Sequence, residues 1–593
     1  MPELSESIAA IKQGAKEDRF TYLTILQYHV KSPEILPALN DVLEQDAQLA
    51  EEIGWDLVQM LLGIPGSETC LETVARLGNP REVIIKVMEA LDGLTEAAGD
   101  EEAATTPDVS ARFIVLLGMV AILHRRIKTK YPSRFLGPSL VKVFEAYQPT
   151  PEMTAAVINL VRSLSGRKRP ALPTRKSSIN VTNLDQDGDN SKNAPDPEAE
   201  QEEPTEDKMQ EKLLQAFVTC ILQRYVNQNE MQWSARLLEY YHPEKLVPGK
   251  KTIAQAFNED GPLHQRDAVI GQLVALADDL GLTKLSDSFI AYMYENVTIV
   301  DPLAAFEDFS SPEDIHLSPG GAVCLIAYWV FSSEVFDADN PQPGMYIFPD
   351  HVTLLERFLG TEAQVEIGSS PGIADALLAI GLGLQHKGLI KRGTDTNFMA
   401  YHHHLTLISV FHPDIQIRNA ATSFAGTILH SDPDDQNRLD ILEDLLENCM
   451  FASLKACAVV WLKEELIAAR KGNATNQFSS PDVIDRLQYF VFPATSAVKD
   501  MGEEELLDYW AQNSLFLLQV ANFAFFLFSE GCRGLVPAGM RSAVEQRFAE
   551  PLVGAAERLL KRAKGQGGLG GLGEKDTMGV SILAERLKGL PLQ

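Results

Sequence analysis

The amino-acid sequence predicts an all-α protein made of stacked helical repeats and interrupted by one disordered linker. Apolar residues recur along most of the chain at the spacing of one helix face, which is the main signature of amphipathic helices. Residues that start and stop helices bracket many of these segments. Sustained strand-type alternation is scarce. GMYIF at 344–348 and SFIAYMY at 288–294 could each form a short strand, and we interpret the second as helix.

The length of the chain favours several packing units over a single core. With 593 residues, of which 45% are hydrophobic and 23% charged, the composition is globular. Since one domain usually has roughly 150 residues, about four units or one elongated repeat array are expected. The longest apolar stretch, 514–528, is shorter than the ~20 residues of a membrane-spanning helix and contains polar residues, so no membrane span is predicted.

The first strong helix signal is EEIGWDLVQMLLGIPG at 51–66, which is apolar around nearly its whole circumference. A helix of this kind needs protein on every side, because a surface helix normally keeps a polar half. The turn that ends at Pro80 and the apolar stripe at 83–91 supply a following helix that could cover it. Stacked repeats would therefore shield Trp55, although an ordinary helical bundle with a buried Trp is the alternative.

Several other helices have recognisable ends. Pro107 and Pro371 follow Thr or Ser and occupy the first helical position, where proline is favoured. Gly360 and Gly388 end the helices that begin at 350 and 371. The stretch 209–228 has apolar residues in pairs every three or four positions, and its other face is polar.

The segment 400–450 has the pattern of a repeat unit. It reads as a helix, a turn at Pro413 and Asp414, a second helix through Arg418, Ala420 and Ala421, and a third helix after another turn. This order resembles the HEAT-repeat pattern, in which small alanines let paired helices pack closely and the Asp and Arg form bonds within or between repeats. Because no strict period recurs elsewhere, we expect an irregular HEAT/armadillo-like solenoid.

The segment between the two richest helical regions has almost no large apolar residue. Residues 167–207 contain six basic and ten acidic residues, and such a segment cannot bury enough surface to offset its ordering entropy. We therefore divide the chain into four parts: an N-terminal helical block at 1–163, a disordered charged linker at 164–208, a HEAT-like block at 209–564, and a Gly-rich linker with a short terminal helix at 565–593.

Two runs of residues resemble a known family. GWDLVQMLL followed by GNPREVIIKVMEAL, together with the segment 400–450, is similar to the family of animal glomulin, a plant lateral-root protein and the fungal Yap-binding proteins. The fungal branch is the most similar. The resemblance implies an all-helical adaptor without catalysis. Glomulin-like members cap the RING subunit of cullin ubiquitin ligases, whereas fungal members assist a redox-responsive bZIP transcription factor or act at kinetochores.

The resemblance therefore implies a regulator of an oxidative-stress bZIP transcription factor in a fungus, with inhibition of a cullin-RING ligase and a kinetochore role as alternatives. No partner-contacting residue of the family matches a position of this chain. An all-helical enzyme with an unrecognised site is the alternative from another class, and a buried cluster of titratable groups in a deep pocket would favour it.

The charge of the chain indicates what kind of partner to expect. The formal net charge is −30, and residues 167–207 account for only −4 of it, which leaves about −26 for the rest of the chain. Such a body repels phosphate backbones and anionic membranes, so nucleic acid and membrane surfaces are not expected as direct partners. Proteins with basic segments, such as a bZIP factor or a RING or cullin subunit, are expected instead.

The sequence has no metal, cofactor or catalytic motif. His402, His403 and His404 are adjacent, so their side chains point about 100° apart on a helix and cannot all face one ion; a surface or groove patch is the simpler interpretation. Cys449 and Cys457 share one helix stripe and are best explained by core packing. Cys532 is the one candidate redox residue, because it lies beside Arg533 and a redox thiol needs exposure and a cationic neighbour.

The expected location is the cytoplasm. No signal peptide is evident at the N-terminus, and the six scattered cysteines lack CxxC spacing, which favours reduced thiols. The basic run GRKRP at 166–170, with Arg175 and Lys176, could act as a nuclear import signal, so the chain could also enter the nucleus.

Overall fold

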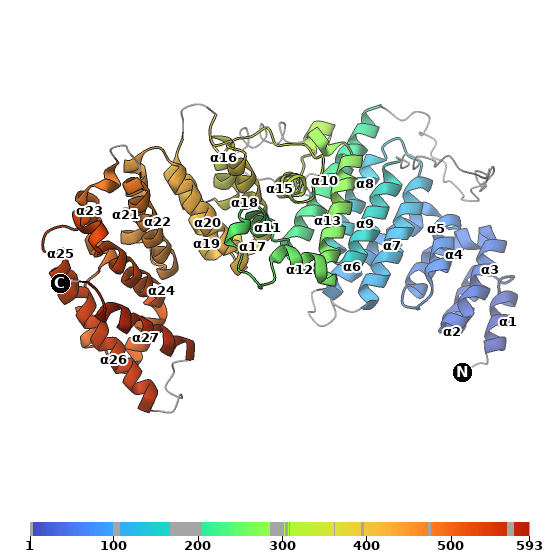
Figure 1. The fold of residues 1–593 in the computed structure, drawn as a ribbon. Coiled ribbons are helices and arrows are strands. Elements are labelled where there is room, and N and C mark those ends of the chain that lie inside the picture. The colour runs from blue at the N-terminus through green and yellow to red at the C-terminus, as the bar shows by residue number, and fades with distance from the viewer. Residues whose placement is uncertain are drawn as a thin grey trace. The chain divides into compact units, whose positions relative to one another are not determined.

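The computed structural model confirms the all-α class. It describes residues 4–98, 107–166, 204–284, 302, 306, 309–360, 362–392, 396–471, 476–565 and 574–591. Within these ranges there are 26 α-helices and no strand, and the helices are joined by short turns and 3₁₀ segments (Figure 1). The segment 344–348, which could have been a strand, contributes only an isolated bridge between Phe348 and Lys391. The segment 288–294 lies outside the described residues.

The chain forms two compact units. Unit 1 contains residues 1–344 and 375–383, and unit 2 contains residues 345–374 and 384–593. This division differs from the predicted blocks, because the first unit continues well past residue 209. The expected linker, 164–208, lies largely outside the described residues, but its last five residues belong to a helix that begins at Pro204. Apolar patterning could not locate that start, because the first turn of the helix is polar.

Unit 1 contains the first fourteen helices. They are α1 (Leu4–Gly14), α2 (Arg19–His29), α3 (Leu36–Gln45), α4 (Ala47–Leu61), α5 (Glu68–Leu77), α6 (Pro80–Ala98), α7 (Pro107–Arg126), α8 (Ser133–Ala146), α9 (Pro151–Leu164), α10 (Pro204–Gln228), α11 (Trp233–Tyr241), α12 (Ile253–Glu259), α13 (Gly261–Asp279) and α15 (Pro319–Val335).

The helices of unit 1 stack in chain order. From α3 to α9 most helices contact the next helix in the chain or the next but one, and Figure 1 shows α6, α7, α8 and α9 side by side. Each layer therefore covers the apolar face of the layer before it, which is the packing of a helical-repeat solenoid. The stack continues because α10 packs on α8 and α13 packs on α9.

The helix that contains Trp55 is not covered on every side. In α4, Ile53, Gly54, Leu57 and Val58 are buried, but Trp55 is only half-buried and the acidic residues of the helix are exposed. The prediction that this helix is apolar on all sides was wrong. The buried residues form one stripe, and Trp55 and Met60 lie at its edges and do not form a second apolar face. The ring of Trp55 is nevertheless covered by α6, whose Lys86 places its Nζ 4.6 Å from the ring centroid.

The turn before Pro80 holds α4, α5 and α7 together. A Cβ atom on Gly54 would lie 3.2 Å from the Cα atom of Gly78, so the helix and the turn are in close backbone contact there. Arg126, at the end of α7, is buried and donates from Nη1 to the carbonyl oxygens of Ala75 and Gly78, at 2.7 and 2.8 Å. These bonds satisfy carbonyl groups at the C-terminal end of α5, where helices leave acceptors unpaired.

Unit 2 contains the remaining helices. They are α16 (Asp350–Leu359), α17 (Ala363–Ser369), α18 (Pro371–His386, of which residues 375–383 belong to unit 1), α19 (Phe398–Phe411), α20 (Ile415–Ser431), α21 (Asp435–Asn448), α22 (Ala452–Lys471), α23 (Pro481–Val491), α24 (Glu503–Leu527), α25 (Met540–Val544), α26 (Glu550–Gly565) and α27 (Glu574–Lys588).

The predicted repeat unit at 400–450 is present in unit 2 as α19, α20 and α21, with turns where the sequence places them. The helix α19 packs on α20, α21 packs on α22 and α23, and α22 packs on α24. At the C-terminal end α27 packs against α26 and α24, and the Gly-rich stretch before it, 566–573, lies outside the described residues.

No single helix in the described ranges is both long and apolar enough to cross a lipid bilayer. Taken together, α17 and α18 pass that test of length and composition, but they are bent by 101° where they meet.

Candidate protein-binding groove

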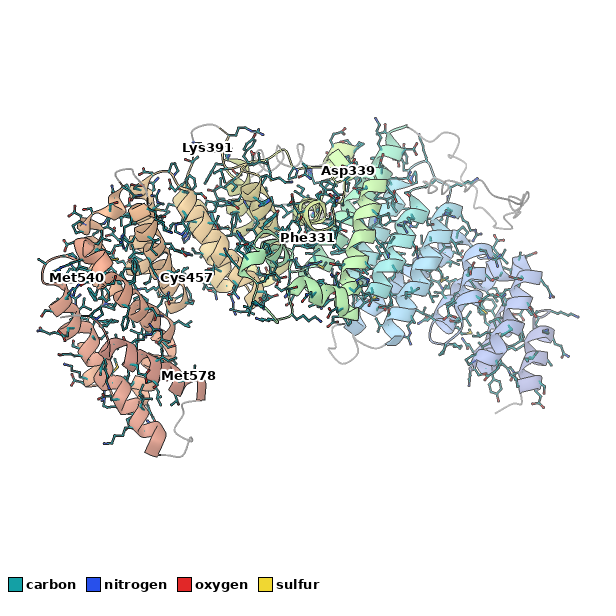
Figure 2. All side chains as sticks on the ribbon, viewed as in Figure 1. Phe331, Asp339, Lys391, Cys457, Met540 and Met578 are labelled. Carbon is teal, nitrogen blue, oxygen red and sulfur yellow. The ribbon has the colours of Figure 1, made fainter. Side chains whose placement is uncertain are left out.

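A groove of about 460 Å³ opens on the surface of unit 2, between the predicted repeat unit at 400–450 and the start of the helix that follows it. Three parts of the chain line it: the end of α19, the first two turns of α20, and the start of α22. The lining residues are Ser409, Val410, Phe411, Ile415, Arg418, Asn419, Thr422, Phe451, Ser453, Leu454 and Cys457. Figure 2 labels Cys457, which α22 contributes. The volume lies in the range of roughly 300–1,000 Å³ that is usual for binding pockets.

The first wall of the groove is positioned by the turn between α19 and α20. The backbone N–H of Asp414 donates to Nδ1 of His412 at 3.0 Å, so the other ring nitrogen, Nε2, carries the proton and donates to the carbonyl oxygen of Pro371 at 3.1 Å. The carboxylate of Asp414 then accepts from the backbone N–H of Gln416 and caps α20. His412 is buried, and the bonds of this turn therefore fix the position of Ile415 at the start of α20.

The second wall is positioned by the turn between α21 and α22. The backbone N–H of Phe451 donates to Sγ of Cys449 at 3.4 Å, which holds the start of α22 against the end of α21. The ring of Phe451 meets the ring of Phe411 edge-on, with centroids 5.5 Å apart, so the two walls touch at one end of the groove.

The rim of the groove is apolar and exposed. Ile415 is 52% exposed, Phe451 38%, and Met450, next to Phe451 in the same turn, 90%. Ile415 and Phe451 line the groove, and Met450 is exposed beside Phe451. Turn residues are normally polar, and exposed large apolar side chains gathered at one place are uncommon on a protein surface that has no partner. We refer to these three residues as the apolar rim.

One cation lies among the apolar lining residues. Arg418 is half-buried on α20, and within the described part of the chain its guanidinium has no ion-pair or hydrogen-bond partner. Arg486, on the neighbouring α23, is different, because it pairs with both Asp440 and Glu443 of α21. Arg418 is therefore a charge that remains available inside the groove.

The lining residues do not form an acid–base site. None of them is a His, Asp, Glu or Lys, so a nucleophile such as Ser409 or Cys457 has no general base among them. Burial raises the pKa of the Cys457 thiol to about 11, which keeps it protonated at neutral pH. The lining combines apolar side chains with one cation, Arg418, and offers no general base.

A comparison with protein families shows to which family the chain belongs. The model of a family described as "Uncharacterised protein family, YAP/Alf4/glomulin" matches residues 1–584. The chain belongs to the YAP/Alf4/glomulin family. No curated protein matches it. The resemblance seen in the sequence is thereby confirmed, and the match extends across both units of this family member.

The residues predicted to mark repeats are not all close to the groove of this family member. Pro413 and Asp414 form the turn beside it, and Arg418 lies inside it. Arg418 was expected to bond within or between repeats, as in the HEAT pattern. Asp414 does bond within the repeat, to the first turn of its own helix, but within the described residues the Arg418 side chain makes no such bond and lines the groove instead. Trp55 and Pro80 belong to unit 1.

The groove residues Phe411 and Phe451, and Met450 beside them, were not predicted from the sequence. Apolar periodicity assigns such residues to a buried stripe and does not reveal that a neighbouring layer is missing over them. One signal was present: Met450 and Phe451 occupy a turn between two helices, where apolar residues are uncommon.

The three adjacent histidines do not form a surface patch. His402 is 2% exposed and its ring packs edge-on against Trp461 of α22, while His404 is half-buried. Burial lowers the pKa of His402 to about 3 and that of His404 to about 4, so both are neutral at pH 7. In the described residues no group of three or more His, Cys, Asp or Glu side chains could hold a metal ion.

Cys532 does not have the environment that a redox role was expected to need. It is 1% exposed, and the cation beside it is Arg470, which donates from Nη1 to Sγ at 3.2 Å. The sequence analysis expected this cation to be Arg533, the next residue in the chain. The prediction failed because residue 532 lies in a 3₁₀ turn that packs against α23 and α24, and this tertiary contact buries the thiol.

A network of charged side chains joins α20 and α21 of the repeat unit to α22. Arg438 is buried and donates from Nε to Glu465 at 3.0 Å, and Nδ1 of His430 lies 2.6 Å from the other oxygen of Glu465. Nε2 of His430 also lies 3.0 Å from the carboxylate of Glu464. Arg438 in turn bonds to Asp435 and to the carbonyl oxygen of Asp432. None of these residues lines the groove, so the network serves to hold the helices together.

Proposed function

We propose that this chain is a non-catalytic adaptor that binds protein partners and that one binding site is the groove in unit 2. The observation that carries the proposal is the apolar rim: Ile415 and Phe451 line an opening whose lining has no acid–base group, and Met450 is exposed beside Phe451. Exposed apolar clusters of this kind mark protein-interaction sites. Membership of the YAP/Alf4/glomulin family supports the same function.

We further propose that the partner is an oxidative-stress bZIP transcription factor of a fungus and that the chain regulates it. The support is electrostatic: the net charge of −30 favours partners with basic segments, such as the basic region of a bZIP factor. The structure exposes acidic side chains in both units. Glu52 and Asp56 are exposed on α4 of unit 1, and Glu504 and Asp508 are exposed on α24 of unit 2.

The test uses the purified full chain and a fluorescent peptide of a bZIP basic region. Binding is expected to weaken at least several-fold between roughly 50 and 300 mM salt, because exposed charges are screened beyond a Debye length of about 10 Å at 0.1 M. Two charge-neutralised variants, Glu504→Gln/Asp508→Asn and Glu52→Gln/Asp56→Asn, locate the acidic face that attracts the peptide. Affinity that is unchanged by salt and by both variants would refute the electrostatic part of the proposal.

Partner identity is tested by affinity purification with mass spectrometry from cells with and without peroxide treatment. A bZIP factor recovered preferentially after peroxide supports the proposed duty. Recovery of RING or cullin subunits, or of kinetochore proteins, in its place would assign the chain to one of those duties instead. The purified candidate must then bind the purified chain directly.

We propose that the chain acts in the cytoplasm and also enters the nucleus, where a transcription factor works. The basic run at 166–170, which lies largely outside the described residues, is the candidate import signal. Replacing the basic residues among 166–176 by alanine is expected to lower the nuclear fraction of a fluorescent fusion. An unchanged nuclear fraction would remove this signal from the proposal.

A further inference from the structure

We infer that the groove in unit 2 takes a partner segment in which an apolar side chain stands next to an Asp or Glu carboxylate. This inference rests on the proposed adaptor function and names the chemistry of the segment that enters the groove. The chain as a whole favours basic partners, so an acidic and apolar segment in this groove is a second and distinct specificity.

Arg418 contributes a positive charge to the groove. An arginine in a partly apolar site normally gains a carboxylate partner, as Arg236 does with Asp267 in unit 1 and Arg486 does with Asp440 and Glu443 in unit 2. Within the described residues Arg418 has no such partner, although it is only half-exposed. A carboxylate from outside would pair with it in the bidentate geometry that guanidinium groups favour.

Apolar side chains surround the charge of Arg418. Ile415 is on the same helix as Arg418, one turn before it, so the two side chains lie on one face of α20. Phe451 and Leu454 face them from the start of α22. A partner residue that buries an apolar side chain against Ile415 and Phe451 would therefore place its neighbour in the chain within reach of Arg418.

A basic partner segment is unfavourable in this groove. A Lys or Arg in the groove would place a second cation beside the Arg418 guanidinium, and like charges repel. The lining contains no carboxylate that could offset this repulsion. The remaining polar lining residues, Asn419 and Thr422 among them, can bond either to a carboxylate or to a peptide backbone.

The experiment measures binding of fluorescein-labelled peptides of about twelve residues to the full chain by polarisation. The test peptide contains Leu and Phe flanked by Glu in a Gly–Ser background. A second peptide has Lys in place of each Glu, and a third has Ser in place of Leu and Phe. We expect the first peptide to bind and the other two to bind at least tenfold more weakly.

Variants assign the binding to the groove. Arg418→Ala is expected to weaken binding of the acidic peptide about tenfold, as loss of a charge-assisted bond does, and Arg418→Glu is expected to transfer preference to the Lys peptide. Ile415→Asp is expected to abolish binding, and it should not harm folding because an acidic residue at a helix N-terminus is favourable. Lys561→Ala removes an exposed cation of α26, outside the groove, and is the matched control with unchanged binding.

Alkylation of Cys457 gives a second readout. The bound acidic peptide is expected to slow modification of Cys457, which lines the groove, relative to Cys449, which does not. Equal binding of the three peptides, or no effect of Arg418→Ala, would overturn the inference. If the acidic peptide fails while the bZIP basic region still binds with salt dependence, the adaptor function stands and only this inference falls.

Discussion

The carboxylate of Asp375 accepts a hydrogen bond from the backbone N–H of Trp233, which lies 142 residues earlier in the chain, at 2.8 Å. Its other oxygen accepts from the backbone N–H of Ser234 at 3.0 Å and from the hydroxyl of the same residue. Asp375 is 2% exposed and belongs to α18, while the two donors begin α11. Since the residue before α11, Gln232, makes no side-chain cap, a distant residue provides the cap that the local sequence lacks.

Substitution of Asp375 is expected to destabilise unit 1 strongly. Asp375→Ala leaves three buried donors without their acceptor, which should cost about 3 kcal/mol in the free energy of unfolding. Asp375→Asn keeps one acceptor oxygen and should cost less. Denaturant unfolding followed by circular dichroism measures both, with Asp56→Ala, an exposed position on α4, as the control that should change stability by less than about 0.5 kcal/mol. Equal stability of Asp375→Ala and the control would contradict the capping role.

Gly321 of α15 is expected to tolerate no side chain. A Cβ atom there would lie 1.9 Å from the carbonyl oxygen of Thr219 on α10, and that contact is with backbone, which cannot rotate away. Gly321→Ala should therefore cost at least about 3 kcal/mol. Gly118→Ala in α7 is the matched control: it lies in a helix with nothing near the new Cβ and should stabilise by roughly 0.5–1 kcal/mol, as alanine does at such sites. Both are read from thermal and denaturant unfolding.

The helices could be predicted from the sequence wherever their ends are encoded locally. Pro107 and Pro371 begin helices, Gly360 follows the end of one, and the Pro413 and Asp414 turn separates two helices as expected. Local propensity and apolar spacing decide such positions. The division into units could not be predicted, because it depends on contacts such as that between Asp375 and Trp233, whose partners are separated by more than a hundred residues.

The groove was harder to predict than the helices around it. Arg418 was recognised, but the repeat pattern suggested an internal bond, and only the tertiary structure shows that Arg418 lines an opening. Phe411 and Phe451 look like core residues in the sequence. Which apolar residues lack a covering layer is a property of the tertiary packing, and a pattern of period 3.6 carries no information about it.

His430 is expected to make the stability of unit 2 depend on pH. Burial by itself lowers the pKa of His430, but hydrogen bonds to Glu465 and Glu464 outweigh burial and raise the pKa above 6.5. A raised pKa means that the folded state binds the proton more tightly than the unfolded state. The stabilisation is therefore fully present below about pH 6.5 and is lost as the pH rises through the folded-state pKa.

The measurement compares the wild-type chain with His430→Gln by denaturant unfolding at several pH values. The difference in unfolding free energy should be largest at acidic pH and should shrink as the pH rises above about 6.5. Burial lowers the pKa of His402 to about 3 and that of His404 to about 4, so both stay neutral above about pH 5.5 and the comparison is made from there upward. A difference that stays constant or grows toward alkaline pH would show that the carboxylates do not hold the proton.

Thiol reactivity is expected to follow burial and not the sequence neighbours of each cysteine. Cys449 and Cys457 are the half-buried thiols, whereas Cys70, Cys220, Cys324 and Cys532 are buried. A maleimide should therefore modify Cys449 and Cys457 in the folded chain, and slowly, because burial raises the pKa of both thiols.

Modification of Cys532 should require opening of the structure around the contact with Arg470. Its rate should increase steeply when denaturant approaches the unfolding midpoint, while the rates of Cys449 and Cys457 change less. Peptide mass mapping assigns each site, and Cys457→Ser is the control in which modification of Cys449 should be unchanged. If Cys532 were modified in the native chain as fast as Cys449, the thiol would be accessible and a direct response of this residue to oxidants would again be a tenable hypothesis.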